Sequence, residues 1–163
     1  MDTAALSDAS KLLTVILMFI GGSPGSTAGG IKTTSVAVVL VFLFSGIRGR
    51  RGAYVFGRRI PDDAMKRTGM IVSTNLILAL CGALVLCGTQ SLPLSDVLIE
   101  TFSAIGTVGM STGITRELTN FSALIVALLM YCGRVGSVSF AMALLERRSD
   151  PPVTYPTEQV TVG

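Results

Sequence analysis

The fold of this chain is decided by a glycine-rich stretch that reads Gly21-Gly22-Ser23-Pro24-Gly25-Ser26-Thr27-Ala28-Gly29-Gly30-Ile31-Lys32-Thr33-Thr34. Strongly apolar sequence lies on both sides of it, at 12–20 and 35–44. Unpaired backbone N–H and C=O groups cost several kcal/mol each in lipid, so this segment must be buried in protein or line a watery cavity. The stretch therefore predicts an intramembrane loop at 21–34, of the kind that borders the path of an ion or substrate.

The composition is that of an integral membrane protein. Half of the 163 residues are apolar and 14% are charged, a balance that ordinary soluble domains do not have. Apolar runs at 69–88 and 121–145 are each long enough to cross about 30 Å of hydrocarbon as helices. The first apolar region, 9–47, would measure about 58 Å as a single helix. We therefore expect an all-α membrane fold whose first helix is broken by the 21–34 loop.

Basic residues predict the orientation in the membrane. A run of seven cations, Arg48, Arg50, Arg51, Arg58, Arg59, Lys66 and Arg67, connects the first and second apolar regions, and Arg147 and Arg148 follow the last. Because cytoplasmic loops are enriched in Lys and Arg, both basic segments are expected in the cytoplasm and the 89–120 connection outside. A nucleic-acid patch is the alternative explanation, but beside a membrane helix an orientation signal with anionic lipid contacts is favoured, so no nucleic-acid partner is expected.

Metal and redox chemistry have little basis in this sequence. The chain contains no histidine, which is the commonest metal ligand. Its three cysteines, Cys81, Cys87 and Cys132, lie inside apolar runs and are interpreted as small buried hydrophobic residues.

A second polar, glycine-rich stretch lies between the second and third apolar runs. It follows a short amphipathic segment at 95–105, about half the length of a membrane span, for which Ser95 or Asp96 is a candidate cap. The chain then reads Gly106-Thr107-Val108-Gly109-Met110-Ser111-Thr112-Gly113 and returns to the outside. A half-length helix followed by Thr-Val-Gly is typical of a cation filter, in which backbone carbonyls replace the hydration shell of a monovalent ion.

Four charged residues near these motifs are candidate functional residues. Arg134 lies about 15 Å from the charged group that ends the last apolar run, so a buried partner is favoured over a snorkelling side chain. Lys32 has two open explanations, a role in gating or the ion path, and a reach into the wider cytoplasmic vestibule. Asp96 and Glu100 share the outward face of the short helix and attract cations to a pore mouth, unless Asp96 simply caps the helix.

Three motifs in this order closely resemble the Trk/Ktr/HKT superfamily of potassium and sodium transporters. They are the 21–34 stretch, Ser103-Ala104-Ile105-Gly106-Thr107-Val108-Gly109-Met110-Ser111-Thr112-Gly113, and Gly133-Arg134-Val135-Gly136. The tail that ends at Gly163 makes the chain most similar to the C-terminal part of the bacterial Ktr membrane subunit. Members resemble four fused copies of a potassium-channel unit, each with an outer helix, a pore helix with filter, and an inner helix.

The resemblance implies a division of the chain. It assigns 1–47 to the inner helix of the third unit with its gating loop 21–34, 48–67 to a basic cytoplasmic loop, 68–148 to a complete fourth unit and 149–163 to a cytoplasmic tail. Within the fourth unit it implies an outer helix at 68–88, a pore helix at 95–105, a filter at 106–113 and an inner helix at 121–148.

The resemblance also implies the site residues. The filter of the fourth unit is Thr107, Val108, Gly109 and Met110, with K+ held by backbone carbonyls near Gly109. Arg134 is implied to contact the gating loop and hold it closed by donating to its carbonyls. The loop comprises Gly21, Gly22, Ser23, Pro24, Gly25, Ser26, Thr27, Ala28, Gly29, Gly30 and Lys32.

The implied function is that of the C-terminal portion of a potassium uptake transporter, with sodium as an alternative substrate and with passive or ion-coupled translocation. No covalent cofactor is implied. The expected partners are the lipid bilayer, the missing pore units, a second copy in a homodimer, and a cytoplasmic nucleotide-binding regulatory subunit. The expected location is the cell membrane, as a multi-pass protein with a cytoplasmic C-terminus. A filter needs four contributing segments, so this chain alone, as a fragment or one part of a split transporter, is not expected to conduct selectively.

Two other functions fit parts of the sequence. A truncated, non-conducting membrane scaffold would use the glycines only to pack helices. A P-loop nucleotide-binding protein would use Gly25 to Thr33, which approximates the phosphate-binding motif, but Ile31 separates the last glycine from Lys32. That motif should also follow a β-strand, and here an apolar membrane segment precedes it.

Overall fold

The computed structural model describes residues 3–26, 28–49, 54–55 and 58–136, and this part of the chain is mostly α-helical. The helices are α1 (Asp8–Ile20), α2 (Thr33–Ile47), α3 (Asp62–Thr89), α4 (Leu94–Gly106) and α5 (Asn120–Val135), with short 3-10 turns η1 (Thr3–Ala5) and η2 (Ile114–Arg116). A two-stranded antiparallel hairpin, β1 (Tyr54–Val55) with β2 (Arg58–Arg59), lies in the basic loop. The sequence predicted the helical class and did not predict this hairpin.

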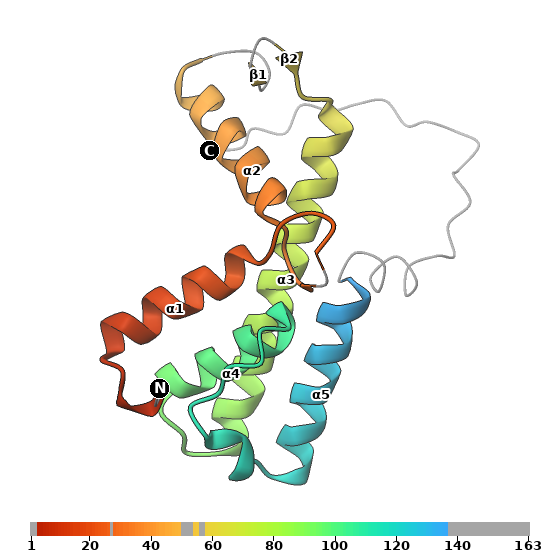
Figure 1. Cartoon of the computed structure of the whole chain (residues 1–163). Helices are drawn as coiled ribbons and strands as arrows, with labels where there is room; N and C mark the ends of the chain where they lie inside the picture. The colour runs from red at the N-terminus through yellow and green to blue at the C-terminus, as the bar shows by residue number, and fades with distance from the viewer. Residues whose placement is uncertain (1–2, 27, 50–53, 56–57, 137–163) are drawn as a thin grey trace, which may run out of the picture.

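The half-length helix α4 forms the centre of the structure. α3 runs through the whole length of the molecule, with α4 and α5 beside its lower half and α2 beside its upper half (Figure 1). α4 packs against α1, α3 and α5, and every residue from Ile99 to Gly106 is buried. Phe102 of α4 meets Phe19 of α1 edge-to-face, with ring centroids 5.7 Å apart. A helix too short to span a membrane is thus enclosed by three other helices.

Glycines allow these helices to approach closely. A Cβ atom on Gly82 of α3 would lie 2.5 Å from Leu129 Cδ1 of α5, and one on Gly133 of α5 would lie 2.1 Å from the carbonyl oxygen of Ile105 in α4. Between helices in lipid, packing at small residues rather than the hydrophobic effect drives association. These two glycines therefore set the distances at which α3 and α4 pack against α5.

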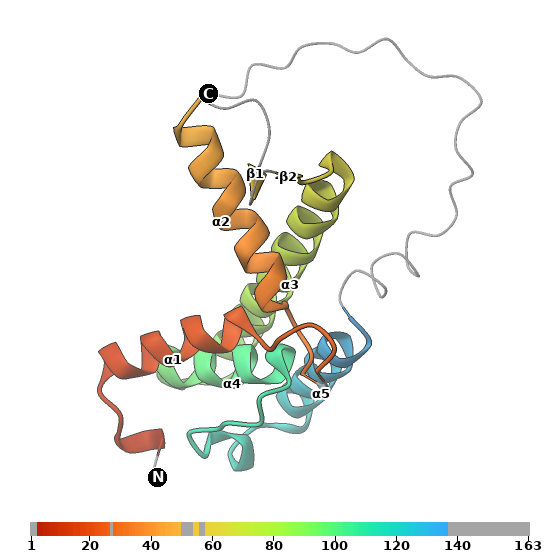
Figure 2. The same ribbon diagram turned by 45° about the horizontal axis from the view of Figure 1, so that its top comes forward.

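The first apolar region is broken where the sequence predicted it. α1 ends at Ile20, before Gly21 with φ +59, and α2 starts at Thr33. The two helices leave the break in clearly different directions (Figure 2). The loop folds back on itself, because Thr33 N–H donates to Gly22 O at 3.0 Å. The non-helical segment is 21–32, two residues shorter than expected, since Thr33 and Thr34 form the first turn of α2.

The predicted helix bounds differ from the observed ones at several ends. α3 begins at Asp62, after Pro61, with two acidic residues in its first turn, a favourable position for negative charge. α4 begins at Leu94 after Pro93, so the predicted cap at Ser95 or Asp96 is wrong. α5 begins after its cap Thr119 and ends before Gly136, which has φ +93. The rest of the predicted inner helix, 137–148, and the tail 149–163 lie outside the described residues.

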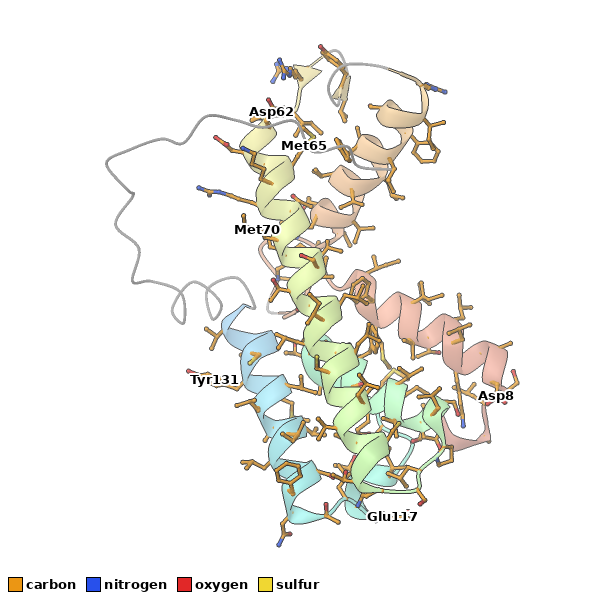
Figure 3. The ribbon with its side chains drawn as sticks, turned by 180° about the vertical axis from the view of Figure 1, so that it is seen from behind. Asp8, Asp62, Met65, Met70, Glu117 and Tyr131 are labelled. Carbon is orange, nitrogen blue, oxygen red and sulfur yellow. The ribbon has the colours of Figure 1, made fainter. Side chains whose placement is uncertain are left out.

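The outer surfaces are largely apolar. In the described part of the chain, α3 alone is both long and apolar enough to cross a membrane, while α2 and α5 are shorter apolar helices. The side chains of Met70 on α3 and Tyr131 on α5 extend away from the packed helices (Figure 3) and are exposed. Cys81 and Cys87 are also exposed, which corrects the expectation that all three cysteines are buried; Cys132 is buried. These surfaces are suited to lipid or to further protein.

An ion pair joins α1 to α4. Lys11 Nζ lies 2.7 Å from Asp96 Oδ1, and the two side chains are 11% and 16% exposed. Removing one partner of a buried pair leaves an uncompensated charge, at a cost of up to about 3–5 kcal/mol. We expect Lys11→Met to lower the thermal unfolding midpoint of the detergent-solubilised full-length protein by several degrees.

The matched control for this change is Arg59→Met. It breaks the Arg59–Asp62 pair, whose side chains are 58% and 60% exposed, and exposed pairs contribute at most about 1 kcal/mol. Equal shifts in the two variants would contradict a structural role for the Lys11–Asp96 pair.

Candidate functional site

The candidate filter segment begins at the carboxyl end of α4. Thr107 has φ +53 and ψ +38, a left-handed conformation that turns the chain out of the helix. Its N–H donates to Ala104 O at 3.2 Å, and Val108 N–H donates to Ser103 O at 3.0 Å. Both bonds satisfy carbonyls that the end of a helix leaves free. The start of the segment is therefore anchored to α4 itself.

The rest of this segment is open. Gly109 has φ +83, and a Cβ atom there would meet nothing within 4 Å. Its neighbours Val108 and Met110 are 43% and 38% exposed. Little side-chain packing therefore constrains the backbone between Val108 and Met110, and its conformation depends on the glycine and on the bonds at its two ends.

The glycine-rich loop packs directly against this segment. Gly29 N–H donates to Thr107 Oγ1 at 2.7 Å, and Gly30 N–H donates to Gly133 O of α5 at 3.2 Å. A Cβ atom on Gly29 would lie 2.6 Å from Gly133 O and 2.6 Å from Thr107 Cγ2. Glycine is thus required at position 29 for the loop to reach both neighbours. Residues from three distant parts of the sequence meet at this point.

A cavity of about 440 Å³ lies beside this contact. It borders α1, the loop and the start of the 107–110 segment. Its lining comprises Thr14, Leu17, Met18, Gly21, Gly22, Ala28, Gly106, Thr107, Val108 and Met110. The broken helix and the candidate filter therefore face the same space.

The remaining predicted loop residues form an exposed turn. Ser23 to Ser26 are exposed, and Ser26 Oγ donates to Ser23 O at 2.6 Å. Lys32 Nζ donates to the carbonyl of Ala28 and, at 3.4 Å, to that of Ser26, so its ammonium group satisfies carbonyls of its own loop. Thr27 lies outside the described residues.

Arg134 lies in the last turn of α5, next to Gly133. Its side chain is exposed, although the sequence favoured a buried partner, and α5 ends one residue later, at Val135. Beside it, the main-chain carbonyl of Gly133 accepts a hydrogen bond from Gly30 N–H of the loop. At this point the loop is a hydrogen-bond donor to α5, a main-chain contact that the sequence did not predict.

The structure also argues against a phosphate-binding loop. The segment 21–32 follows the helix α1 and precedes the helix α2, whereas the phosphate-binding motif follows a β-strand. Ile31, which interrupts the motif, is buried with 2% of its surface exposed.

Two acidic residues of the half-length helix have partners that the sequence did not predict. Asp96 is paired with Lys11, and Glu100 is 3% exposed with both carboxylate oxygens accepting hydrogen bonds. Neither is placed to draw cations to an open mouth, so that expectation is wrong. The burial of Glu100 was not predicted, although a charge inside an apolar half-length helix is the same signal that singled out Arg134. Lys11, in the first apolar region, carried that signal too.

A half-length helix that ends in a glycine-containing segment and packs against a broken helix, all within apolar helices, defines an α-helical membrane protein of the channel or transporter class. The chain belongs to the TrkH family of cation transport proteins, which it matches over residues 1–150. This confirms the resemblance to the Trk/Ktr superfamily, which consists of transporters rather than enzymes.

The chain is similar over nearly its whole length to several cation uptake proteins. This chain is 36% identical over 168 residues to the potassium/sodium uptake protein NtpJ of Enterococcus hirae, and the match covers 99% of this chain and 37% of that protein. It is 37% identical over 164 residues to the Ktr system potassium uptake protein D of Bacillus subtilis, covering 99% and 36%. It is 31% identical over 163 residues to protein B of the same system, covering 100% and 36%. The chain thus spans little more than a third of the length of these relatives.

Proposed function

We propose that this chain is the C-terminal portion of a transporter that takes up potassium, with sodium as an alternative substrate, through a channel-like pore closed by the glycine-rich loop. Translocation is passive or ion-coupled. The observation that carries the proposal is the hydrogen bond from Gly29 N–H to Thr107 Oγ1, because it joins the broken helix to the base of the Thr-Val-Gly segment. The names of the relatives, which are potassium or potassium/sodium uptake proteins, support the choice of ion.

In this proposal, Thr107, Val108, Gly109 and Met110 form one of four filter segments, and backbone carbonyls near Gly109 hold K+. Three features support the assignment: the half-length helix before the segment, its anchored start, and the positive φ of Gly109. Carbonyl oxygens substitute for the water shell of a monovalent cation when the backbone is free to turn them inward.

The loop 21–32 is the gate beneath that filter. Its described bonds to the filter and to α5 are few and weak enough to break, since each neutral hydrogen bond contributes about 0.5–1.5 kcal/mol. Two conformations of such a loop therefore differ by only a few kcal/mol. Arg134, beside Gly133 in the last turn of α5, is the proposed partner that biases the loop toward the closed state.

The remaining units of the pore are supplied by protein outside this chain. α1 exposes Leu12, Leu13, Ile16 and Leu17, each by half or more of its surface, and the other pore units are proposed to cover this face. The proposal also includes assembly into a homodimer, binding to a cytoplasmic nucleotide-binding subunit, and a C-terminus that lies in the cytoplasm. In it, α1 and α2 are the broken inner helix of the third unit, and α3 to α5 belong to the fourth.

The test is complementation by the full-length chain that carries this segment. In a host that lacks potassium uptake, the intact chain should restore growth at low potassium, and deleting residues 94–113 should abolish uptake. Membrane levels of both proteins are compared by immunoblot. Unchanged uptake after this deletion would contradict the proposal and favour a scaffold whose helices only pack.

A further inference from the structure

A buried carboxylate lies behind the candidate filter. Glu100 is in the middle of α4 with 3% of its surface exposed. Its Oε2 atom accepts from Ser111 Oγ at 2.8 Å, and its Oε1 atom accepts from Thr115 Oγ1 at 2.6 Å. A carboxylate is costly to bury unless its oxygens are hydrogen-bonded. The two hydroxyl groups supply that compensation, so Glu100 and the two residues are bound to each other.

Both hydroxyl groups belong to the chain that leaves the filter segment. Ser111 directly follows Met110, and Thr115 lies in η2. Ser111 Oγ also accepts from Gly113 N–H at 3.0 Å and lies 2.8 Å from Thr115 Oγ1. Its carbonyl oxygen accepts from the hydroxyl of Thr3. Ser111 is thus the point at which the exit of the filter is attached to α4 and to η1.

The two ends of the filter segment are consequently tied to one helix. At its start, Thr107 and Val108 donate to carbonyls at the end of α4. At its exit, Ser111 Oγ donates to Glu100. Glu100 lies in α4, less than two turns before the end of that helix. Between these attachments, Gly109 and the exposed side chains of Val108 and Met110 contribute little packing. The distance between the attachments then determines how far the intervening backbone can relax around an ion.

We propose that Glu100 is a positioning residue that sets ion preference by holding Ser111 and Thr115, and with them the exit end of 107–110. The proposal rests on the proposed function of that segment as a filter. It concerns the shape and hydrogen bonding of Glu100, not the attraction of its charge for ions. A side chain that preserves the size and bonding of Glu100 without its charge should therefore preserve selectivity.

The experiment compares variants of the full-length transporter by competition of K+ and Na+ for uptake. Glu100→Ala should lower the preference for K+ about tenfold, equivalent to about 1.4 kcal/mol, because both hydrogen bonds that attach the exit to α4 are lost. Glu100→Gln should retain most of the preference, because its amide donates to one hydroxyl and accepts from the other. The control is Thr101→Val, since Thr101 Oγ1 donates only within α4 in the described structure, to Val97 O and Leu98 O. It should leave the preference unchanged.

Two outcomes overturn the proposal. Equal losses in Glu100→Gln and Glu100→Ala would show that the charge itself acts on the ion. An unchanged preference in correctly assembled Glu100→Ala, together with a reduced preference in Gly109→Ser, would show that the filter exists and that Glu100 does not position it. An unchanged preference in Gly109→Ser would instead contradict the proposed filter.

A triple substitution keeps the test decisive where Glu100→Ala does not assemble. Ser111→Ala combined with Thr115→Val and Glu100→Gln removes both hydroxyl groups and leaves no unpaired charge buried in α4. This triple variant should reduce the K+ preference as much as Glu100→Ala, because both variants lose the same attachments of the exit to α4. A full K+ preference in the triple variant would overturn the proposal.

Discussion

Replacing Gly109 with serine is expected to lower the preference of the full-length transporter for K+ over Na+ by about tenfold. Within this chain a Cβ atom at this position meets nothing within 4 Å, so the expected effect comes from the backbone rather than from a clash inside the chain. A residue with a side chain costs about 1–3 kcal/mol in such a sparsely populated conformation, and Gly109 has φ +83. The backbone of Gly109→Ser should relax and turn its carbonyls away from the ion.

Gly25→Ser is the matched control for this prediction. Gly25 also has φ +83 and open space around its Cβ position, so the serine introduces the same backbone strain in the exposed turn of the loop. Competition uptake of the two cations should show a changed preference in Gly109→Ser and an unchanged one in Gly25→Ser. Equal changes would indicate general strain, and no change at Gly109 would mean that 107–110 is not a filter.

Displacing the loop is expected to raise the rate of potassium uptake. In Gly29→Ala, the new methyl group would lie 2.6 Å from Gly133 O and 2.6 Å from Thr107 Cγ2, so the loop must move away from the filter and from α5. Losing the hydrogen bonds of Gly29 and Gly30 costs the closed state about 1–3 kcal/mol. A shift of that size raises the open fraction by about 5-fold to 150-fold when the closed state predominates. Shortening residues 22–30, and Arg134→Ala, should act in the same direction.

Initial rates of uptake, normalised to membrane protein level, test this gating prediction. Gly69→Ala is the control, because Gly69 is a helical residue of α3 with nothing within 4 Å of its Cβ position. Its rate should equal that of the unmodified protein. Unaltered rates in Gly29→Ala, in the shortened loop and in Arg134→Ala would contradict the gate. A lower rate in Gly29→Ala would assign the loop to conduction rather than to closure.

Much of the helical organisation follows from the sequence because it depends on local chemistry. A glycine-rich polar stretch between apolar runs cannot continue a helix in lipid, and α1 does end at Ile20, directly before this stretch. A ten-residue amphipathic segment before Thr-Val-Gly cannot span a bilayer, and α4 is the enclosed short helix. These features depend on segment length and backbone polarity, which can be recognised in the sequence without knowledge of the tertiary contacts.

The contacts at the site were harder to predict because main-chain atoms make them. The bond from Gly30 N–H to Gly133 O depends on how closely two segments approach, and every residue carries the same backbone groups. The side-chain pairs Lys11–Asp96 and Glu100–Ser111 join residues 85 and 11 positions apart. Sequence patterns singled out Arg134 and Lys32 as unusual, but the neighbours of a charged group follow from tertiary packing.

The enclosure of α4 has a consequence for biosynthesis. α4 is too short to span the bilayer alone and carries Glu100, Thr101 and Ser103 among its buried residues, so it gains little from lipid before its neighbours are present. α3 can insert independently by its length and composition. The enclosure of α4 is complete only when α5, which follows it in the chain, has been synthesised. The part of the protein around α4 should therefore remain incompletely folded at the translocon until α5 has been synthesised.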